Sequence, residues 1–446
     1  MIVMSLSEIA AVVGGVAHGD AQVTAPASLD SRAVDVGGLF VALAGEHVDG
    51  HDYVESAIEN GAAAALTSRP VGAAPVVVID DVTAALGRLA RHVLDQVHAT
   101  VIAITGSQGK TSVKDLLAHV LESSGPTVAP EGSYNNELGV PLTVLRADLE
   151  TKYLIVEMGA RGLGHIASLC RIAPPDVAVV LNVGHAHVGE FGSPDVTAQA
   201  KGEIVESLTA LDDAVLNADD PRVAAMASRT SGDVLTFGVG GRLALGEVRI
   251  DDAGEPHFTL SIDDLSVDVH VPQIGAHHAI NAAATAAISL ALGLDLAQVA
   301  ERLDRASARS PMRMERHVRD DGLVVINDAY NANPESMAAA LRALAGIGDG
   351  RRVAVLGEML ELGDGSHASH VDLGRLAVEL GVDRVVAVGT GAAGIAEGAG
   401  DLGTTVADVD EALRELSAWL TPADVVLVKA SRGVRLERVT EALLGG

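Results

Sequence analysis

Short apolar runs bounded by turn residues recur along the chain, and stretches with the helical spacing of apolar positions separate them. Runs of this kind are typical of strands buried on both faces of a parallel sheet. The repeated alternation of strand and helix predicts an α/β fold with doubly wound sheets. The predicted strands are Val76–Asp80, Val101–Thr105, Tyr153–Glu157, Val177–Asn182, Leu323–Ile326, Val353–Leu356, Val385–Val388 and Val425–Val428.

Breaks in this pattern divide the 446 residues into three predicted domains, since a chain of this length exceeds one ordinary core. Residues 1–98 form a small α/β domain that ends in a helix around Thr83–Val97. Residues 99–310 form a central, mostly parallel sheet, and alternating polar and apolar residues over Gly246–Val271 predict antiparallel hairpins inserted in it. Residues 311–446 form a third, Rossmann-like α/β domain.

Composition narrows the class of protein. Hydrophobic residues make up 48% of the chain and charged residues 20%, which is the balance of a globular protein. The formal net charge of −29 argues against nucleic acid and against an anionic membrane surface as partners. Cys170 is the single cysteine, the N-terminus lacks the basic segment of a signal peptide, and no charge-free stretch reaches transmembrane length. We therefore expect a cytoplasmic protein without membrane insertion.

A glycine-rich loop lies between the strand at Val101–Thr105 and a helical stretch. Backbone N–H groups of such a loop surround phosphate at a helix N-terminus, while its lysine contacts the β- and γ-phosphates and its threonine hydroxyl binds Mg²⁺. Ile104 stands where the longer form of the motif has its first glycine, so this is a shorter variant. A chance turn between strand and helix is the competing interpretation. The loop residues are Gly106, Ser107, Gln108, Gly109, Lys110 and Thr111.

Further candidate residues follow the next two strands. Glu157 ends an apolar strand, and the carboxyl end of a strand beside a phosphate loop is the expected place for a Mg²⁺-binding acid. His185 and His187 come just after Asn182, and of the two His187 is the preferred candidate. An acid at the end of a strand is more often a solvated loop residue, and a lone histidine is more often structural. The functional interpretations of Glu157 and His187 therefore depend on the presence of the phosphate loop. Lys201 lies fourteen positions beyond His187.

Taken in order, these motifs resemble those of the Mur ligase family, the ATP-dependent amide-forming enzymes of bacterial cell-wall synthesis. The resemblance runs nearly end to end. Its motifs here are the loop TGSQGKT, Glu157, Asn182 with His187, Ala200-Lys201, Gly275-x-His277-x-x-x-Asn281, Pro311-x-Arg313, Asn327-Asp328-x-Tyr330-Asn331 and Val428-Lys429-x-Ser431-Arg432.

Within the family, four stretches are similar to the branch that uses ATP to join D-alanyl-D-alanine to UDP-N-acetylmuramoyl tripeptide through an acyl phosphate. Two alternatives stay open at this point: a sister ligase that adds a single amino acid, and a nucleotide-switched regulator that ligates nothing. The four stretches are Asp30-Ser31-Arg32, Tyr134–Pro141, Asp328–Pro334 and Gly357–Gly363.

The resemblance also implies roles for individual residues, ATP and Mg²⁺ as cofactors, a monomeric chain, and a third domain that closes over ATP about a hinge near Pro311. The implied substrate contacts are Ser31, Arg32, Asn135, Asn136, Tyr330 and Asn331. The implied ATP contacts beyond the loop are Asn281 at adenine, Asp328 at ribose and Arg313 at the phosphates. The implied catalytic residues are Lys110, Glu157, His187, Lys201 and Arg313, and the implied metal ligands are Thr111, Glu157, His187 and a carbamylated Lys201.

Two positions depart from the family pattern. His278 stands where relatives usually have asparagine, so contacts to adenine are expected to differ, and His165 replaces a usual glutamate.

A second glycine motif, Gly389-x-Gly391-x-x-Gly394, follows a strand, and Asp408 lies at the spacing of a ribose-binding acid. Alone, this motif would suggest NAD binding. The resemblance favours close packing of strand and helix as the reason for these glycines.

Overall fold

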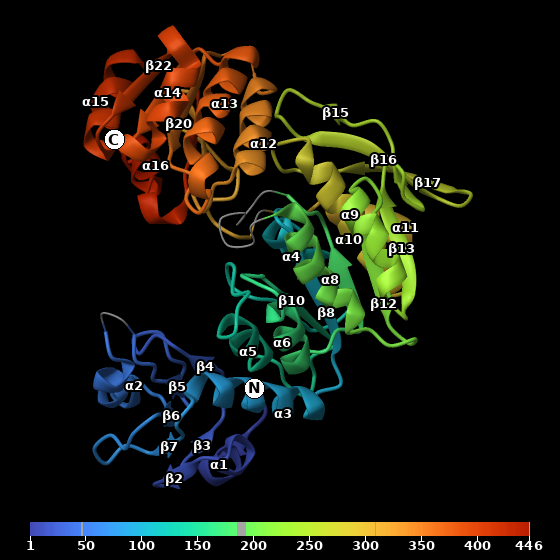
Figure 1. Cartoon of the computed structure of the whole chain (residues 1–446), viewed down its shortest axis with the longest axis vertical. Helices are drawn as coiled ribbons and strands as arrows, with labels where there is room; N and C mark the ends of the chain where they lie inside the picture. Colours follow the sequence, from blue (N-terminus) through green and yellow to red (C-terminus); the bar gives the residue numbers. More distant parts are fainter. Residues whose placement is uncertain (46–47, 185–192, 308, 349, 446) are drawn as a thin grey trace.

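The computed structural model describes residues 1–45, 48–184, 193–307, 309–348 and 350–445. Three principal sheets follow one another along the chain. Figure 1 shows the N-terminal sheet in blue at one end of the molecule, the central sheet in green and yellow, and the C-terminal sheet in orange and red at the other end.

The N-terminal part is a five-stranded sheet in the order β2-β7-β6-β5-β4, parallel except for β2. The first helix forms because Ser5 and Glu8 make a reciprocal capping box, and Gly14 ends that helix in the left-handed conformation at φ 73°. The strands are β1 (Met4–Ser5), β2 (Val16–His18), β3 (Gln22–Val23), β4 (Ala27–Ser28), β5 (Leu39–Val41), β6 (Ala64–Thr67) and β7 (Val76–Val78). The helices are α1 (Leu6–Val13), η1 (Gly50–Tyr53), α2 (Val54–Glu59) and α3 (Val82–Gln96).

The central part is a ten-stranded sheet in the order β15-β16-β14-β13-β12-β11-β8-β10-β9, with β17 on β16. Strands β8 to β14 are parallel, and the three hairpin strands extend the same sheet antiparallel. The strands are β8 (Thr100–Thr105), β9 (Thr127–Val128), β10 (Tyr153–Glu157), β11 (Val177–Val180), β12 (Asp213–Asn217), β13 (Asp233–Gly238), β14 (Leu243–Leu245), β15 (Arg249–Ile250), β16 (Pro256–Ile262) and β17 (Leu265–His270). The helices are α4 (Lys110–Glu122), α5 (Gly139–Val144), α6 (His165–Ile172), α8 (Pro194–Glu206), α9 (Pro221–Ala224), η2 (Ala225–Arg229), α10 (His277–Ala291) and α11 (Leu296–Leu303).

Successive residues of the central strands point to opposite faces of the sheet, so each strand contributes to two cores. On β8, Val101 and Ala103 join the core that continues into the N-terminal part, whereas Ile102 and Ile104 join the core beneath α4 and α10. This double burial explains why most positions of these strands are apolar, and it leaves their carboxyl ends as the place for polar chemistry.

The C-terminal part is a six-stranded sheet in the order β18-β19-β23-β20-β21-β22, parallel except for β18. Separate hydrophobic cores cover its two faces. The strands are β18 (Glu315–Val318), β19 (Val324–Asp328), β20 (Arg352–Gly357), β21 (Arg384–Val388), β22 (Gly403–Val406) and β23 (Val425–Lys429). The helices are α12 (Pro334–Ala345), η3 (Gly363–Gly365), α13 (Ser366–Glu379), η4 (Thr390–Ala392), α14 (Ala393–Ala399), η5 (Gly400–Leu402), α15 (Val409–Trp419), η6 (Arg432–Val434) and α16 (Glu437–Leu444).

The predicted α/β class is confirmed, including the antiparallel hairpins, and the predicted strands differ from those observed by a few residues at their ends. Each predicted domain range contains one principal sheet, although the boundaries themselves stay predictions. Among the described residues, no helix is both long and apolar enough to cross a membrane.

Candidate active site

The phosphate loop connects β8 to α4 with a backbone that only glycine adopts easily. Gly109, immediately before α4, has φ 83°. A side chain there would also place its Cβ 2.8 Å from Asn281 Oδ1, and a Cβ on Gly106 would lie 2.9 Å from Leu181 Cβ. Both glycines therefore allow the loop to approach α10 and β11 closely.

Asn182, just beyond β11, holds the loop in place. Its Oδ1 accepts hydrogen bonds from the backbone N–H groups of Ser107 and Gln108 at 3.0 Å each, and its Nδ2 donates to Gln108 O at 3.2 Å. The Ser107 hydroxyl in turn accepts from Gly184 N at 2.8 Å. Sequence reasoning used Asn182 only as a spacing marker. Its position at the carboxyl end of a strand was the available signal for a role in the site.

Glu157 lies at the carboxyl end of β10, opposite Ile104 in the register with β8. It is 0% exposed, and among the described residues neither of its carboxylate oxygens has a hydrogen-bond partner. Burial raises the pKa of this carboxyl, and the positive charges of Lys110, Lys114 and Arg313 oppose that shift. A buried carboxylate without a partner is costly, which makes these oxygens suited to binding a cation.

Two lysines face the same space as Glu157. Lys110 begins α4 and donates a 2.5 Å hydrogen bond to Gly106 O, and burial lowers its pKa while Glu157 raises it. Lys201 lies on α8 and is 4% exposed. Burial, together with the nearby charge of Lys110, lowers the pKa of Lys201 well below its usual value. His187 belongs to the segment 185–192, outside the described residues, so its role stays a hypothesis.

Arg313 reaches from the start of the C-terminal part onto the phosphate-loop helix. Its Nη2 donates to Thr111 Oγ1 at 3.3 Å and to Ser133 Oγ at 3.2 Å, and its guanidinium lies 4.3 Å from the centre of the Tyr330 ring. Both neighbours of Arg313 in sequence have left-handed backbones, Met312 at φ 57° and Met314 at φ 52°. Strained backbone of this kind concentrates at functional sites, because the surrounding structure must hold it.

Asp328 and Lys429 end the neighbouring strands β19 and β23 and are register partners. Lys429 Nζ donates to Asp328 Oδ2 at 2.6 Å and to Asn331 O at 2.8 Å, and Asp328 Oδ1 accepts from Met314 N at 3.2 Å. Burial lowers the pKa of Lys429, and Asp328 opposes that shift. Lys429 was noted only as part of a motif. Its place at the end of an apolar strand was again the signal for a site residue.

Two histidines at the start of α10 border the same cavity. The rings of His277 and His278 lie 4.3 Å apart, centre to centre. Burial lowers the pKa of His277 to about 4 and that of His278 far below its usual value. His278 Nδ1 is buried without a hydrogen-bond partner among the described residues. Both rings are therefore neutral at physiological pH. The Nδ1 atom of His278, which lines the cavity, remains available to a ligand.

One cavity of about 350 Å³ brings most of the predicted site residues together. It lies between the central and C-terminal sheets, since both contribute lining residues. The predicted residues that line it are Gly106, Ser107, Gln108, Gly109, Lys110, Thr111, Asn135, Asn136, Glu157, Lys201, Asn281, Arg313, Asp328, Tyr330 and Asn331.

Ser31 and Arg32 line a second, larger cavity of about 1010 Å³, which the central part completes with Tyr134 and Arg146. Ser31 is buried, and its backbone carbonyl accepts a 2.9 Å hydrogen bond from Asn60 Nδ2. Arg32 is exposed and paired with Asp30 at 2.7 Å. The N-terminal substrate residues thus lie apart from the phosphate loop, in a cavity of their own.

The paired asparagines at 135 and 136 have different local roles. Asn136 Oδ1 accepts from Leu138 N at 3.2 Å and Gly139 N at 2.9 Å, which fixes the turn that leads into α5. Asn135 O accepts from Gly159 N at 2.7 Å, and a Cβ on Gly159 would lie 2.9 Å from Asn135 Oδ1. Gly159 therefore leaves the space that the Asn135 amide occupies beside the end of β10.

Close packing explains the second glycine motif, Gly389-x-Gly391-x-x-Gly394. A Cβ on Gly391 would overlap the Glu358 carboxylate, and a Cβ on Gly394 would lie 3.0 Å from the Cβ of His370 on α13. These glycines allow α14 and its preceding turn to lie close to β20 and α13, as the family resemblance leads us to expect.

Comparison with known proteins agrees with this architecture along the whole chain. Residues 27–93 match the Mur ligase family catalytic domain, residues 104–289 match the Mur ligase middle domain, and residues 312–432 match the Mur ligase glutamate ligase domain. The chain belongs to the Mur ligase family. The similarity to full-length relatives of the family covers the whole of this chain.

Three of the most similar relatives are named as ligases of one branch. A UDP-N-acetylmuramoyl-tripeptide–D-alanyl-D-alanine ligase from Mycobacterium bovis is 45% identical, covering 100% of this chain and 98% of the relative. The crystal structure of MurF from Acinetobacter baumannii superposes with a TM-score of 0.90 at 32% identity, covering 100% of both chains. A MurF ligase from Thermotoga maritima in complex with ADP superposes with a TM-score of 0.81 at 31% identity, covering 95% of this chain and 98% of that one.

Proposed function

We propose that this chain joins D-alanyl-D-alanine to UDP-N-acetylmuramoyl tripeptide, with ATP converted to ADP and phosphate, as a step of peptidoglycan precursor synthesis. The observation that carries the proposal is the cavity in which the phosphate loop, the buried Glu157 carboxylate and Arg313 meet. The names of the full-length relatives specify the dipeptide rather than a single amino acid. They therefore favour this branch over the sister ligases, and a ligase over a regulator.

The cavity residues fit Mg²⁺. Hard oxygen ligands suit this ion, and Glu157 offers two buried oxygens that have no partner among the described residues, close to the Thr111 hydroxyl of the phosphate loop. Glu157 and Thr111, with His187 from the segment outside the described residues, would hold the ion. When bound, Mg²⁺ would neutralise charge on the transferring phosphoryl group.

We further propose that Lys201 carries a carboxyl group. An ammonium buried near Lys110 and a bound cation would be repelled, and burial already favours the neutral amine. A neutral amine can add carbon dioxide and release a proton, which leaves an anionic carbamate whose oxygens suit Mg²⁺. Lys201 would then contribute negative charge where a free lysine would contribute positive charge.

The reaction divides into two transfers. A terminal carboxylate oxygen of the tripeptide bonds to the γ-phosphorus of ATP, and the bond from that phosphorus to the bridging oxygen breaks to release ADP. The neutral amine of D-alanyl-D-alanine then attacks the acyl carbon, loses a proton, and displaces phosphate. Lys110 and Arg313 would stabilise the phosphoryl charge, and the cavity between the central and C-terminal sheets would hold the reactants in line.

The residues that line the two cavities are the proposed contacts to the remaining parts of the substrates. Residues 1–98 hold the UDP moiety through Ser31 and Arg32, and residues 99–310 hold ATP, with Asn281 toward adenine. Residues 311–446 complete the site with Arg313, Asp328 at the ribose, and Tyr330 and Asn331 toward the peptide. We propose that the chain acts as a monomer.

Phosphate release separates the three candidate functions. The unaltered chain should release phosphate from ATP only when UDP-N-acetylmuramoyl tripeptide and D-alanyl-D-alanine are both present. Release that requires a single amino acid would identify a sister ligase. Binding of ATP without release under any combination of substrates would identify a regulator.

Separate substitutions of the paired asparagines should give different results. Asn135→Ala should raise KM for the UDP-linked peptide and leave KM for ATP nearly unchanged, because its amide lies beside Gly159 at the end of β10 and belongs neither to the phosphate loop nor to α10. Asn136→Ala should instead lower the free energy of unfolding by about 1–2 kcal/mol, since it removes two hydrogen bonds of the turn before α5. Steady-state kinetics and thermal melts measure these effects. A change confined to KM for ATP would contradict the assignment of Asn135.

A further inference from the structure

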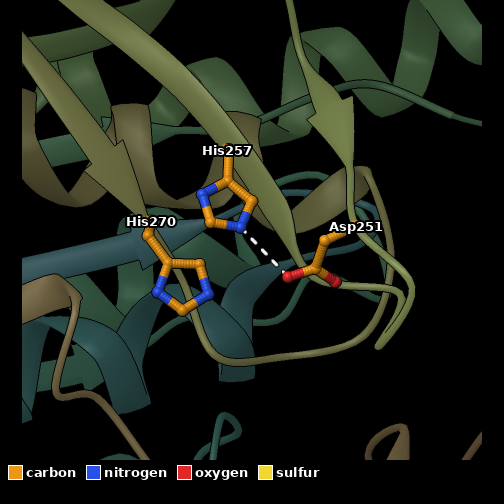
Figure 2. Close-up of side chains that lie close together, drawn as sticks. All are labelled: Asp251, His257 and His270. Atoms are coloured by element: carbon orange, nitrogen blue, oxygen red, sulfur yellow. Dashed lines mark hydrogen bonds and ion pairs between the residues drawn. The ribbon is translucent and has the colours of Figure 1, made fainter.

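A second cluster of metal-binding side chains lies in the hairpin region of the central sheet. His257 on β16 and His270 on β17 are directly opposite each other in the antiparallel register, and Asp251 lies in the turn between β15 and β16. One possible ligand atom of each residue lies within 4.8 Å of the others. Figure 2 shows the two stacked rings beside the Asp251 carboxylate, to which His257 is hydrogen-bonded.

We propose that Asp251, Glu255, His257 and His270 form a binding site for a divalent cation of the zinc class, separate from the ATP site. Two imidazole nitrogens with two carboxylate oxygens are a donor set typical of zinc, whereas Mg²⁺ prefers oxygen alone. None of these four residues lines the cavity around the phosphate loop.

Two nitrogen–oxygen distances in the cluster approach those of a tetrahedral centre. His257 Nε2 lies 3.0 Å from Asp251 Oδ2, and His270 Nε2 lies 3.0 Å from Glu255 Oε2. Ligand bonds of about 2.0–2.2 Å at the tetrahedral angle would separate each nitrogen and oxygen by roughly 3.4 Å. Each pair is thus close to the separation that two ligands of one ion require, whereas the ligand atoms of Asp251, His257 and His270, which lie within 4.8 Å of one another, must close by up to about 1.4 Å.

Neighbouring groups already orient the ligands. Asp251 Oδ1 accepts hydrogen bonds from Ala253 N and Glu255 N at 2.9 Å each, which leaves Oδ2 toward His257. His270 Nδ1 lies 2.8 Å from Asp304 Oδ1. Metal-binding histidines commonly donate their second nitrogen to a carboxylate in this way, which fixes the ring and directs Nε2 to the ion.

His270 also faces an excess of acceptors. Both of its ring nitrogens contact carboxylates, Asp304 on one side and Glu255 on the other, but a neutral imidazole has only one N–H to donate. Either an extra proton or a cation at Nε2 must complete the arrangement. The four side chains are between 24% and 42% exposed, so an ion can enter from solvent.

The rings must rotate out of their stack to share one ion. Their planes are 14° apart with centres 4.4 Å apart, whereas the lone pair of each Nε2 lies in its own ring plane. The ring torsion of histidine has a broad minimum, so this rotation is available to both side chains. A bound ion would then connect the β15–β16 turn to β17 and, through Asp304, to the end of α11.

Zinc titration of the chelator-treated full chain, with ADP and excess Mg²⁺ present to saturate the ATP site, tests the proposal. The unaltered chain should bind one more Zn²⁺ than the His257→Gln and His270→Gln variants. His367→Gln is the matched control, because His367 also pairs with a carboxylate, Glu397 at 3.3 Å, outside the cluster. Asp304→Asn should weaken zinc affinity by roughly 10–100-fold, as expected for a group that orients a ligand.

A measurement on the unaltered chain keeps the test independent of whether the variants fold. Anomalous diffraction at the zinc edge should show a peak between Asp251, Glu255, His257 and His270. Equal zinc stoichiometry in the unaltered and His257→Gln chains, or no peak at the cluster, would overturn the proposal. In that case an additional proton on His270 would account for its two carboxylate contacts.

Discussion

Lys110→Ala is expected to reduce ligation by roughly 10²–10³-fold or more, the loss typical of removing a group that stabilises transition-state charge. The Lys110 ammonium extends into the cavity beside Glu157, and its hydrogen bond within the protein goes to Gly106 O of its own loop. Removing it should therefore leave the fold intact. The coupled release of phosphate measures the loss, and a thermal melt without nucleotide measures stability.

Lys152→Ala is the matched control for this substitution. Lys152 is exposed and donates to Ser124 O at 3.0 Å, away from the cavity, so its loss should leave ligation nearly unchanged. Ligation by Lys110→Ala at the level of the unaltered chain would contradict the assignment of the phosphate loop. Loss of its cooperative melt would show that Lys110 is a structural residue instead.

Lys201→Ala should be nearly inactive and should recover part of its activity when a short carboxylic acid such as formate or acetate is added. The physical reason is the carbamate proposed at Lys201, because a small carboxylate can occupy the space of the missing anionic group. The neutral amine is the form that adds carbon dioxide, and burial lowers the pKa of Lys201 so that this form is available near neutral pH. Enzyme stripped of bicarbonate should accordingly lose activity and regain it when bicarbonate is restored.

The two lysine variants distinguish a missing anion from a missing cation. Added carboxylate should rescue Lys201→Ala but not Lys110→Ala, because the second variant lacks positive charge at the phosphates. Full activity of Lys201→Ala, or of enzyme rigorously freed of bicarbonate, would show that Lys201 is an ordinary buried lysine. Rescue of both variants to the same extent would indicate a general effect of the added salt.

Much of the site follows from local sequence pattern. Apolar runs that end in Glu157 or Asp328 predict polar groups at the carboxyl ends of parallel strands, which is where both residues lie. The strand, glycine loop and helix around Lys110 can also be predicted from local sequence, because the left-handed backbone at Gly109 excludes most other residues. These features depend on periodicity and backbone stereochemistry, which neighbouring residues determine.

Other contacts depend on residues far apart in the chain. Arg313 reaches Thr111 across 202 positions, and Lys429 pairs with Asp328 across 101. The pairing of His257 with His270 requires a particular register of β16 and β17, since a shift of one residue would turn one ring to the other face. Local pattern predicts that these side chains are near strand ends or on hairpins, but not which partner each one meets.

The sequence by itself determined the α/β class, the order of the sheets and the nucleotide loop, because strand and helix periodicity and glycine stereochemistry are local properties. Only the tertiary structure decided that Glu157 is fully buried, that Asn182 holds the phosphate loop, and that Ser31 lies in a cavity separate from Lys110. Burial and hydrogen-bond partnership arise when distant segments pack together, and that packing sets the charge and the ligands available at each site.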